Sequence, residues 1–180
     1  MALCCDFLAW RLSLFAEMKY HCTLAERHAE LLRQHNASWL NLWNAIAAYY
    51  YAWLGKTDKI PEVFRAHRLS TVHTLAPGKP MIEMIENQVG LAQGDYARVV
   101  GRSERLLAVC EGMHYALVAM HIRIQTAAAY EMLGKHAEAQ AQLDQALTDA
   151  EPDGFVIPFA ENYRYLKPLL TERLQTGTVA

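Results

Sequence analysis

Histidines are the residues whose number first suggests chemistry, because eight occur among 180 positions. His21, His28 and His35 recur every seven residues, and His114 and His121 have the same spacing. Seven residues rise about 10.5 Å along a helix, whereas two ligands of one metal ion on a helix need spacings of about three or four. The spacing therefore favours histidines that pack between helices, with a metal-binding or pH-sensing role as the alternative.

Nucleophile and acid–base motifs are equally weak. The sequence contains no GxSxG and no CxxC. The cysteines lack the regular spacing of a disulfide framework and favour buried small side chains in a reducing compartment: Cys4, Cys5, Cys22 and Cys110. Glu83 and Glu86 share a helix face and could form a general-acid pair, but a solvated face explains them more simply. We predict no catalytic residue, no metal and no cofactor, so the protein is not expected to be an enzyme.

Composition narrows the class of protein further. Hydrophobic residues make up 53% of the chain, which excludes a disordered polypeptide. Seventeen basic and nineteen acidic residues give a formal charge of −2, which argues against a basic nucleic-acid-binding domain. No apolar run reaches the roughly 18 residues of a membrane helix, and Asp6 and Arg11 interrupt the apolar N-terminus. These features predict one cytoplasmic domain over residues 1–180, without membrane or direct nucleic-acid binding.

A helical period of 3.6 residues runs through nearly the whole chain, and about eight breaks divide it into about nine helices. Three of these breaks resemble one another: Leu-Gly-Lys at Gly55, Gly-Asp-Tyr at Gly94 and Leu-Gly-Lys at Gly134. The glycines lie 39 and 40 residues apart. A fixed period of about 20 to 50 residues is the mark of a helical solenoid, so the sequence predicts an all-α array of helix pairs.

The last unit of this repeat shows the pattern most clearly. Ala127, Tyr130 and Leu133 share one helix face directly before Gly134, which can adopt the left-handed conformation that ends a helix. The following helix carries an inward stripe: Ala139, Leu143, Ala146 and Leu147. The unit around Gly55 repeats the first half with Ala48, Tyr51 and Leu54, and Phe64 takes the place of Leu143.

The segment Tyr130–Ala139, followed by Ala146 and Leu147, resembles a tetratricopeptide repeat with long helices. The closing segment, residues 150–159 and then 166–170, resembles that of the large ATP-dependent, MalT-like LuxR-family transcriptional regulators. This resemblance covers roughly residues 117–174. It implies a superhelix of about four helix pairs closed by a helix near 159–175. It also implies a sensor domain that binds a small-molecule inducer or a protein partner, with self-association possible, and signals to ATPase and DNA-binding modules.

Two departures from that family affect the expected function. No GxxxxGK[ST] phosphate loop occurs, and only seven residues follow Arg173, too few for a helix-turn-helix. We therefore expect a fragment of a longer regulator or a stand-alone relative, which neither hydrolyses ATP nor binds DNA by itself. The alternative function is a generic tetratricopeptide scaffold that binds peptides or proteins and has no role in transcription.

Aromatic residues indicate where a ligand or partner would bind. If Tyr51 packs between paired helices, Tyr49 and Trp53 point away from that stripe by about 160°. In a tetratricopeptide-like superhelix this face of each first helix lines the concave groove. The same register in the other units places further residues there: Met84, Gln88, His121, Ile124 and Glu131. We predict that these seven residues line an open groove; the alternative is that they pack against neighbouring units or a capping helix.

Overall fold

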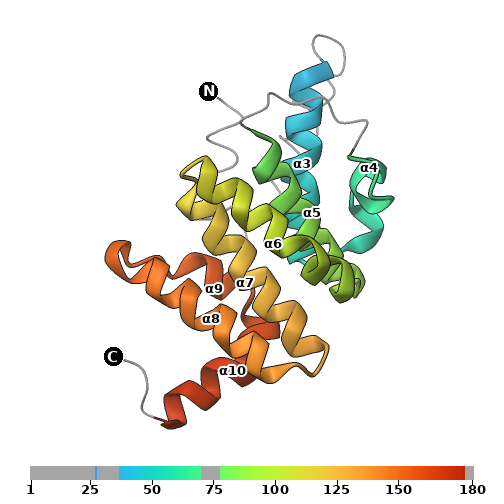
Figure 1. Ribbon diagram of the computed structural model, residues 1–180. Helices are drawn as coiled ribbons and strands as arrows, with labels where there is room; N and C mark the ends of the chain where they lie inside the picture. Colours follow the sequence, from blue (N-terminus) through green and yellow to red (C-terminus); the bar gives the residue numbers. More distant parts are fainter. Residues whose placement is uncertain (1–26, 28–36, 70–77, 177–180) are drawn as a thin grey trace.

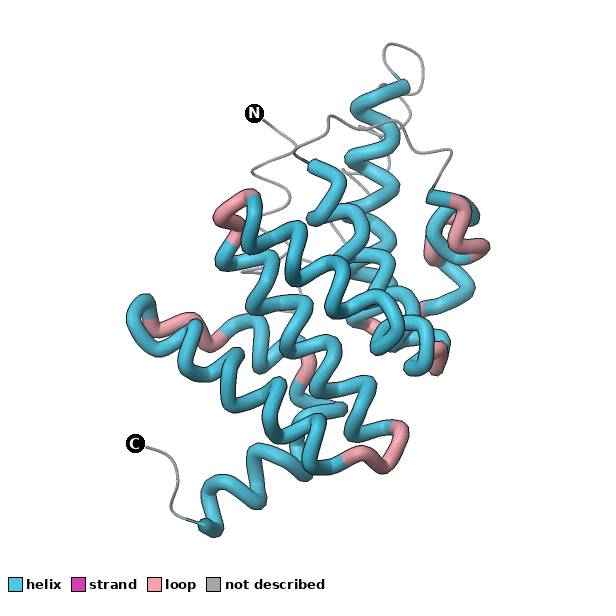
Figure 2. Tube along the Cα trace, in the orientation of Figure 1, coloured by secondary structure: helices cyan, strands magenta, loops and turns pink. Residues whose placement is uncertain are grey.

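The computed structural model describes residue 27, residues 37–69 and residues 78–176. All regular structure in these ranges is helical, and they contain no strand, which confirms the all-α class (Figures 1 and 2). The predictions for His21, His28, His35, Cys4, Cys5 and Cys22 lie outside the described residues.

The elements follow one another with short connections. In chain order they are α3 (Ala37–Trp53), η1 (Thr57–Lys59), α4 (Glu62–Arg65), α5 (Lys79–Gln93), α6 (Tyr96–Gly112), α7 (Ala116–Met132), α8 (His136–Ala150), η4 (Glu151–Asp153), α9 (Ile157–Glu161) and α10 (Tyr163–Thr176). The breaks predicted near residues 55–58, 94–95, 112–113, 134–135 and 151–154 are confirmed. The single closing helix predicted at 159–175 is wrong in one respect, because Asn162 separates α9 from α10.

One turn geometry recurs along the chain. At Gly55, Gly94, Gly134 and Gly154 the backbone φ lies between 63° and 80°, the left-handed region. In each case the next residue donates its N–H to a carbonyl five positions earlier, as in Lys135 N to Tyr130 O at 2.9 Å. This hydrogen bond is the hallmark of the Schellman motif, which satisfies the last carbonyls of a helix.

Two histidines adopt the same turn. His67 and His114 have φ of 53° and 55°, and the residues after them donate to Val63 and Cys110 in the same manner. The turns at residues 94, 114, 134 and 154 are therefore spaced by 20 residues. The 40-residue interval between glycines in the sequence consists of two such helical units.

Helices that follow one another pack as antiparallel neighbours: α5 with α6, α6 with α7, and α7 with α8 (Figure 2). A second set of contacts joins every other helix, α3 with α5 and α5 with α7. The helices thus succeed one another from the top of Figure 1 to α8 at the lower left. Helix α10 continues the series at the bottom, where it contacts α7 and α8.

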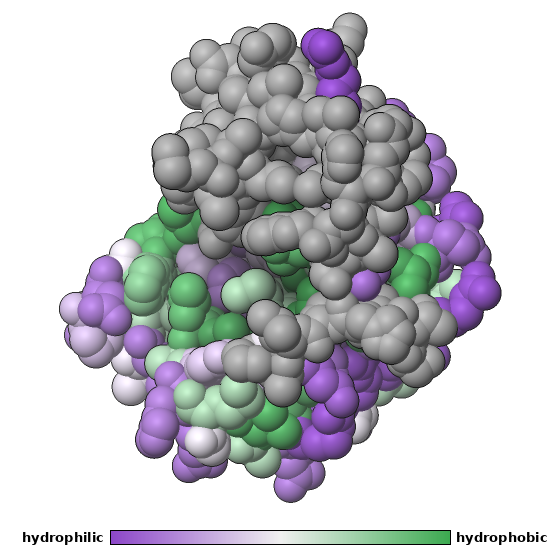
Figure 3. Space-filling view, turned by 90° about the horizontal axis from the view of Figure 1, so that it is seen from above, coloured by the Kyte–Doolittle hydropathy of each residue, from purple (hydrophilic) through white to green (hydrophobic). Residues whose placement is uncertain are grey.

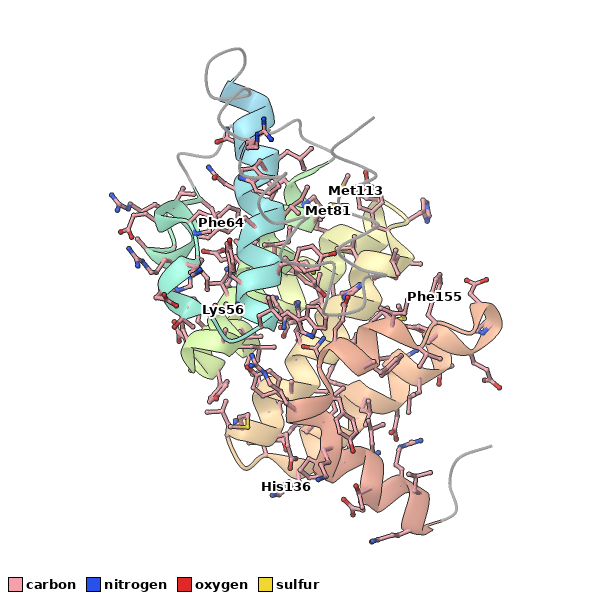
Figure 4. All side chains as sticks on the ribbon, turned by 180° about the vertical axis from the view of Figure 1, so that it is seen from behind. Lys56, Phe64, Met81, Met113, His136 and Phe155 are labelled. Atoms are coloured by element: carbon pink, nitrogen blue, oxygen red, sulfur yellow. The ribbon has the colours of Figure 1, made fainter. Side chains whose placement is uncertain are left out.

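Two apolar clusters hold these helices together. One joins α3, α4, α5, α6 and the start of α7, and Phe64, fully buried on α4, belongs to it. Figure 4 shows Phe64 between α4 and α3. The other joins the end of α5, the start of α6 and much of α7 to α8, α9 and α10. The predicted stripe on α8 is confirmed, because Ala139, Leu143 and Ala146 are fully buried.

The stripe predicted on α7 is correct only in part. Ala127 is fully buried, and Tyr130 is half-buried against the second cluster. Leu133 is exposed, because α7 ends at Met132 and Leu133 lies in the cap beyond the helix.

On the outside of the molecule, hydrophobic and hydrophilic side chains lie side by side on the described surface that Figure 3 shows.

Candidate binding site

The seven residues predicted to line a groove come from three helices that lie side by side. Tyr49 and Trp53 are on α3, Met84 and Gln88 on α5, and the remaining three, His121, Ile124 and Glu131, on α7. Two contacts join the helices on this face. The rings of Tyr49 and His121 lie 6.5 Å apart, edge to face, and the Gln125 amide donates to Gln88 Oε1 at 2.9 Å.

The face is not open, so the prediction of an exposed groove is wrong. Five of the seven side chains are buried: Tyr49, Met84, Gln88, His121 and Ile124. Trp53 and Glu131 are half-buried, and the Glu131 carboxylate lies 2.8 Å from His136 Nδ1. The alternative considered for this face, packing against a closing segment, describes its geometry.

Residues at the α9–α10 junction cover this face. The Tyr49 hydroxyl donates to the Glu161 carboxylate at 2.5 Å, across 112 positions of sequence. The Gln88 amide donates to Asn162 Oδ1 at 3.1 Å, and the Asn162 amide donates to the Pro158 carbonyl at 3.0 Å. With Gln125, these amides form a continuous chain of hydrogen bonds from α7 through α5 to α9.

The start of α10 binds the ends of the same helices. Arg164 donates to the carbonyl of Ala52 in the last turn of α3, and the Tyr165 hydroxyl donates to the carbonyl of Leu91 in the last turn of α5. Their distances are 3.2 and 3.1 Å. Each carbonyl also accepts a backbone hydrogen bond in its turn, from Gly55 N and Gly94 N respectively, so the side chains of α10 add a second bond at these two helix ends. Burial raises the pKa of the Tyr165 hydroxyl, which therefore stays protonated and able to donate.

These covering residues were missed at the sequence level. Glu161, Asn162, Arg164 and Tyr165 fall between the two parts of the closing segment that carry the family resemblance. The available signal was a run of polar and aromatic residues, Glu-Asn-Tyr-Arg-Tyr, between the apolar Pro158-Phe159 and Leu166. Such a run inside a helical closing segment indicates specific polar contacts, because buried polar groups need hydrogen-bond partners.

The carboxylates Glu83 and Glu86 do not lie on a solvated face, which corrects the sequence-based interpretation. Both are buried on α5 and are bound by arginines of α6: Arg102 contacts both carboxylates, and Arg105 contacts Glu83. His67 Nδ1 lies 3.2 Å from the second oxygen of Glu86. Burial works to raise the pKa of Glu83, but hydrogen bonds from the two guanidinium groups outweigh it and lower that pKa. The arginine contacts link α5 to α6, and the lowered pKa keeps Glu83 ionised, which is unsuited to a general acid.

Cys110 and the histidines of the described residues show no reactive arrangement. Cys110 is buried, and burial, followed by the nearby Glu83 charge, raises the pKa of its thiol, which disfavours the reactive thiolate. His114 occupies a turn and His121 the covered face, so they do not face one another on a helix. Within the described ranges no group of three or more histidine, cysteine or acidic side chains could hold a metal ion. None of the helices described there is long and apolar enough to cross a membrane.

Open concave surface lies elsewhere on the molecule. One groove, about 620 Å³ in volume and mainly apolar, runs between α8, the loop after η4 and α10. A second, about 670 Å³ and more polar, lies over α6 and the start of α7 and includes Cys110, His114 and Arg123. Both volumes are within the range of ligand-binding clefts. The described residues therefore form two grooves of a size that suits a ligand or a segment of a partner.

Comparison of the chain with protein-family models, with curated proteins and with solved structures finds no match.

Proposed function

We propose that this chain is the sensor and protein-interaction repeat domain of a MalT-like, LuxR-family transcriptional regulator. In this proposal the helices form a tetratricopeptide-like α-solenoid of about four helix pairs, and the nine-helix count includes residues outside the described ranges. The domain works in the cytoplasm without a cofactor and catalyses no reaction. It binds an inducer or a partner protein and relays the signal to ATPase and DNA-binding modules outside these 180 residues.

The observation that carries the proposal is the regular turn geometry. Schellman turns at residues 94, 114, 134 and 154 divide the second half of the chain into helices of equal spacing. Helices α3, α5 and α7 lie side by side, each paired with the helix that follows. An array in which each unit contacts its neighbours is the architecture of helical-repeat proteins, whose long faces serve as binding surfaces.

The covered face supplies a physical route for signalling. The contact between α9–α10 and the face of α3, α5 and α7 includes hydrogen bonds at Glu161, Asn162, Arg164 and Tyr165. Such contacts are directional, so they hold the closing segment in one position on the face of α3, α5 and α7. A ligand that binds more tightly when the closing segment is either docked on this face or displaced from it would shift the population between these two conformations. Such a shift is the thermodynamic basis of a sensor.

The first experiment is to sequence the genomic reading frame on both sides of this segment. The proposal expects a phosphate-loop ATPase module upstream and a helix-turn-helix downstream in the same frame. A frame that lacks both modules would contradict the transcriptional role and would leave a stand-alone interaction scaffold.

The second experiment tests sensing directly. The purified chain is melted in the presence of sugars, nucleotides and short peptides, and its unfolding temperature is recorded. A ligand at about 100 times its dissociation constant stabilises the folded state by about 2.7 kcal/mol. The sensor proposal expects this stabilisation to change in Asn162→Ala, which removes the hydrogen bonds of Asn162 that hold the closing segment in place. Lys167→Ala, an exposed change on the neighbouring helix α10, is the control. An equal ligand effect in all three proteins would contradict the proposed route.

A further inference from the structure

The groove between α8 and α10 is an open, mainly apolar feature that the covered face does not explain. Its walls are Leu147 of α8 and Leu170 and Leu174 of α10, and the loop that carries Phe155 and Val156 closes one end. Figure 4 shows Phe155 in this loop, on the side of the molecule away from Phe64. Thr148 and Asp144 add polar groups along the α8 wall.

Large hydrophobic side chains are unusually accessible around this groove. Val156 and Leu174 are each 70% exposed, Tyr163 is 51% exposed and Phe155 is 41% exposed. Ile157 extends the patch beside the loop, with 47% of its surface exposed. A contiguous apolar patch of this kind on the surface of a protein marks an interaction site.

The packing of the other helices indicates what shape fits the groove. Helix α6 contacts both α5 and α7, and α8 contacts both α7 and α10, so each of these helices lies between two others. Helix α10 contacts α7, α8 and α9, and its Leu170 and Leu174 also face the groove. Among the described residues no helix fills the position beside α8 and α10. The groove has the form of a helix-binding position that continues the array.

The charged residues around the groove indicate which charges a partner would carry beside its apolar surface. Asp144 on the α8 wall is paired with Arg173 of α10, so these two charges compensate one another. Glu151 lines the groove and Asp153 follows it in η4; both are exposed, and no ion pair of either is found within the described part of the chain. The end of the groove near η4 therefore carries negative charge that a basic partner would complement.

We propose that the α8–α10 groove binds an amphipathic helix of a partner protein. The helix presents an apolar stripe at positions i, i+3 or i+4, and i+7, which packs on Leu147, Val156 and Leu174. Lysine or arginine residues beside that stripe lie near Glu151 and Asp153. This mode follows the general physics of helix-in-groove recognition. The proposal goes beyond the proposed function, because it does not depend on a role in transcription.

The experiment uses the full 180-residue chain and a display library of single helices of about four turns. The positions of the library are randomised on both the stripe and the flanks, and selection is carried out at low and at physiological salt. The proposal expects enrichment of helices with an apolar stripe and basic flanks. Binding of the enriched helices is expected to weaken at least tenfold in Val156→Asp and in Leu174→Asp.

Leu117→Asp is the matched control, because Leu117 is also an exposed apolar residue, 46% accessible, but lies on α7 outside the groove. It should bind the enriched helices as the unmodified chain does. A Glu151→Gln, Asp153→Asn double variant removes the acidic groups. It should lower the affinity for basic helices about threefold to tenfold and should reduce the salt dependence of their binding. Circular dichroism melts confirm that each variant is folded before binding is measured.

Three outcomes would overturn the proposal. The first is a selection that returns no helix whose binding depends on Val156 or Leu174, and the second is a selection that returns helices with acidic flanks. The third is a dimer of the chain that Leu174→Asp dissociates in light scattering, which would assign the groove to a second copy. A reading frame without regulatory modules leaves the result intact, so failure of the proposed function and failure of the groove proposal are distinguishable.

Discussion

At the scale of single residues, the Tyr49–Glu161 contact illustrates how a buried carboxylate is accommodated. Glu161 is 6% exposed, and a carboxyl group at that depth requires hydrogen-bond donors. The Tyr49 hydroxyl is one of them, at 2.5 Å. Because it belongs to α3, the donor also fixes where the α9–α10 junction lies.

Replacing Tyr49 by phenylalanine removes this donor and retains the ring. We expect Tyr49→Phe to lower the free energy of unfolding by about 1–3 kcal/mol, the usual cost of leaving a buried polar group without its hydrogen-bond partner. Urea denaturation measures the change. Tyr163→Phe is the control, because Tyr163 is half exposed to solvent, and its change should stay within about 0.5 kcal/mol. Equal effects of the two substitutions would show that the hydroxyl of Tyr49 contributes nothing to stability.

Glu83 links protonation to stability. Its pKa in the folded protein is lowered from the ordinary value of 4.5, because hydrogen bonds from Arg105 and Arg102 outweigh the opposing effect of burial. A carboxyl whose pKa falls on folding stabilises the protein above the unfolded pKa, and this contribution is lost as pH falls through the folded pKa. The ionised Glu83 therefore stabilises the fold at neutral pH; this contribution begins to decline below about pH 4.5 and is lost as pH falls through the lowered pKa of the folded protein.

Glu83→Gln tests this linkage. The unmodified protein should lose stability progressively as pH falls below 4.5, and the variant should show a shallower dependence in urea melts made between pH 7 and pH 3. Glu104→Gln, an exposed change on α6, should leave the slope unchanged. A slope in Glu83→Gln equal to that of the unmodified protein would assign the acid sensitivity to other carboxylates.

At the scale of the elements, the turns decide where helices end. A residue with a Cβ pays about 1–2 kcal/mol in the left-handed region, whereas glycine in an unfolded chain has about 0.5–1 kcal/mol more conformational freedom to lose. The turns at Gly134 and His114 have the same backbone hydrogen bonds. The left-handed position is occupied by glycine in the first turn and by a residue with a Cβ in the second. They provide a matched pair of substitutions.

We expect His114→Gly to raise the free energy of unfolding by about 0.5–1 kcal/mol, since it relieves the left-handed strain at an exposed residue. Gly134→Ala should lower it by about 1 kcal/mol for the same reason; nothing lies within 4 Å of the added Cβ, so no steric clash contributes. Thermal and urea melts of both variants measure whether each substitution raises or lowers the free energy of unfolding. Two changes of the same sign would show that backbone strain does not control these turns.

The turns also show how far the fold was predictable from sequence. Gly55, Gly94 and Gly134 were visible as breaks, because glycine is the residue that such turns favour. His67 and His114 carry no such signal, so the 20-residue spacing appeared as one of 40 residues. In the first unit, where Phe64 was matched to Leu143, the described residues place Phe64 on the short α4 rather than on a helix as long as α8.

Helical periodicity predicted which residues share a face but not what covers that face. Tyr49, Gln88 and His121 do lie together, as the register indicated. Their cover, at Glu161 and Asn162, lies 74 to 112 positions away in sequence from its partners on α5 and α3. Local spacing contains no information about contacts at that distance, and polar residues in the closing segment could equally have faced water.

At the scale of the whole molecule, the α9–α10 junction changes how the array is coupled. In a simple helical repeat each unit contacts only its neighbours, so unfolding can begin at one end and proceed in steps. Here the hydrogen bonds of Glu161 and Arg164 reach α3, those of Asn162 and Tyr165 reach α5, and α10 packs on α7. A late segment of the chain therefore holds the first described helix in place.

Native-state hydrogen exchange tests this coupling. Asn162→Ala breaks the chain of amides that runs from Gln125 through Gln88 to the Pro158 carbonyl, and leaves buried groups without partners. Loss of a buried hydrogen bond costs about 1–3 kcal/mol, so we expect amide exchange in α3 and α5 to accelerate about fivefold to a hundredfold, together with that in α9 and α10. Lys167→Ala, exposed on α10, should leave exchange in α3 unchanged. If Asn162→Ala accelerates exchange only in α9 and α10, the closing segment is a separate unit, and α3 is held by its contacts with α5, α4 and η1.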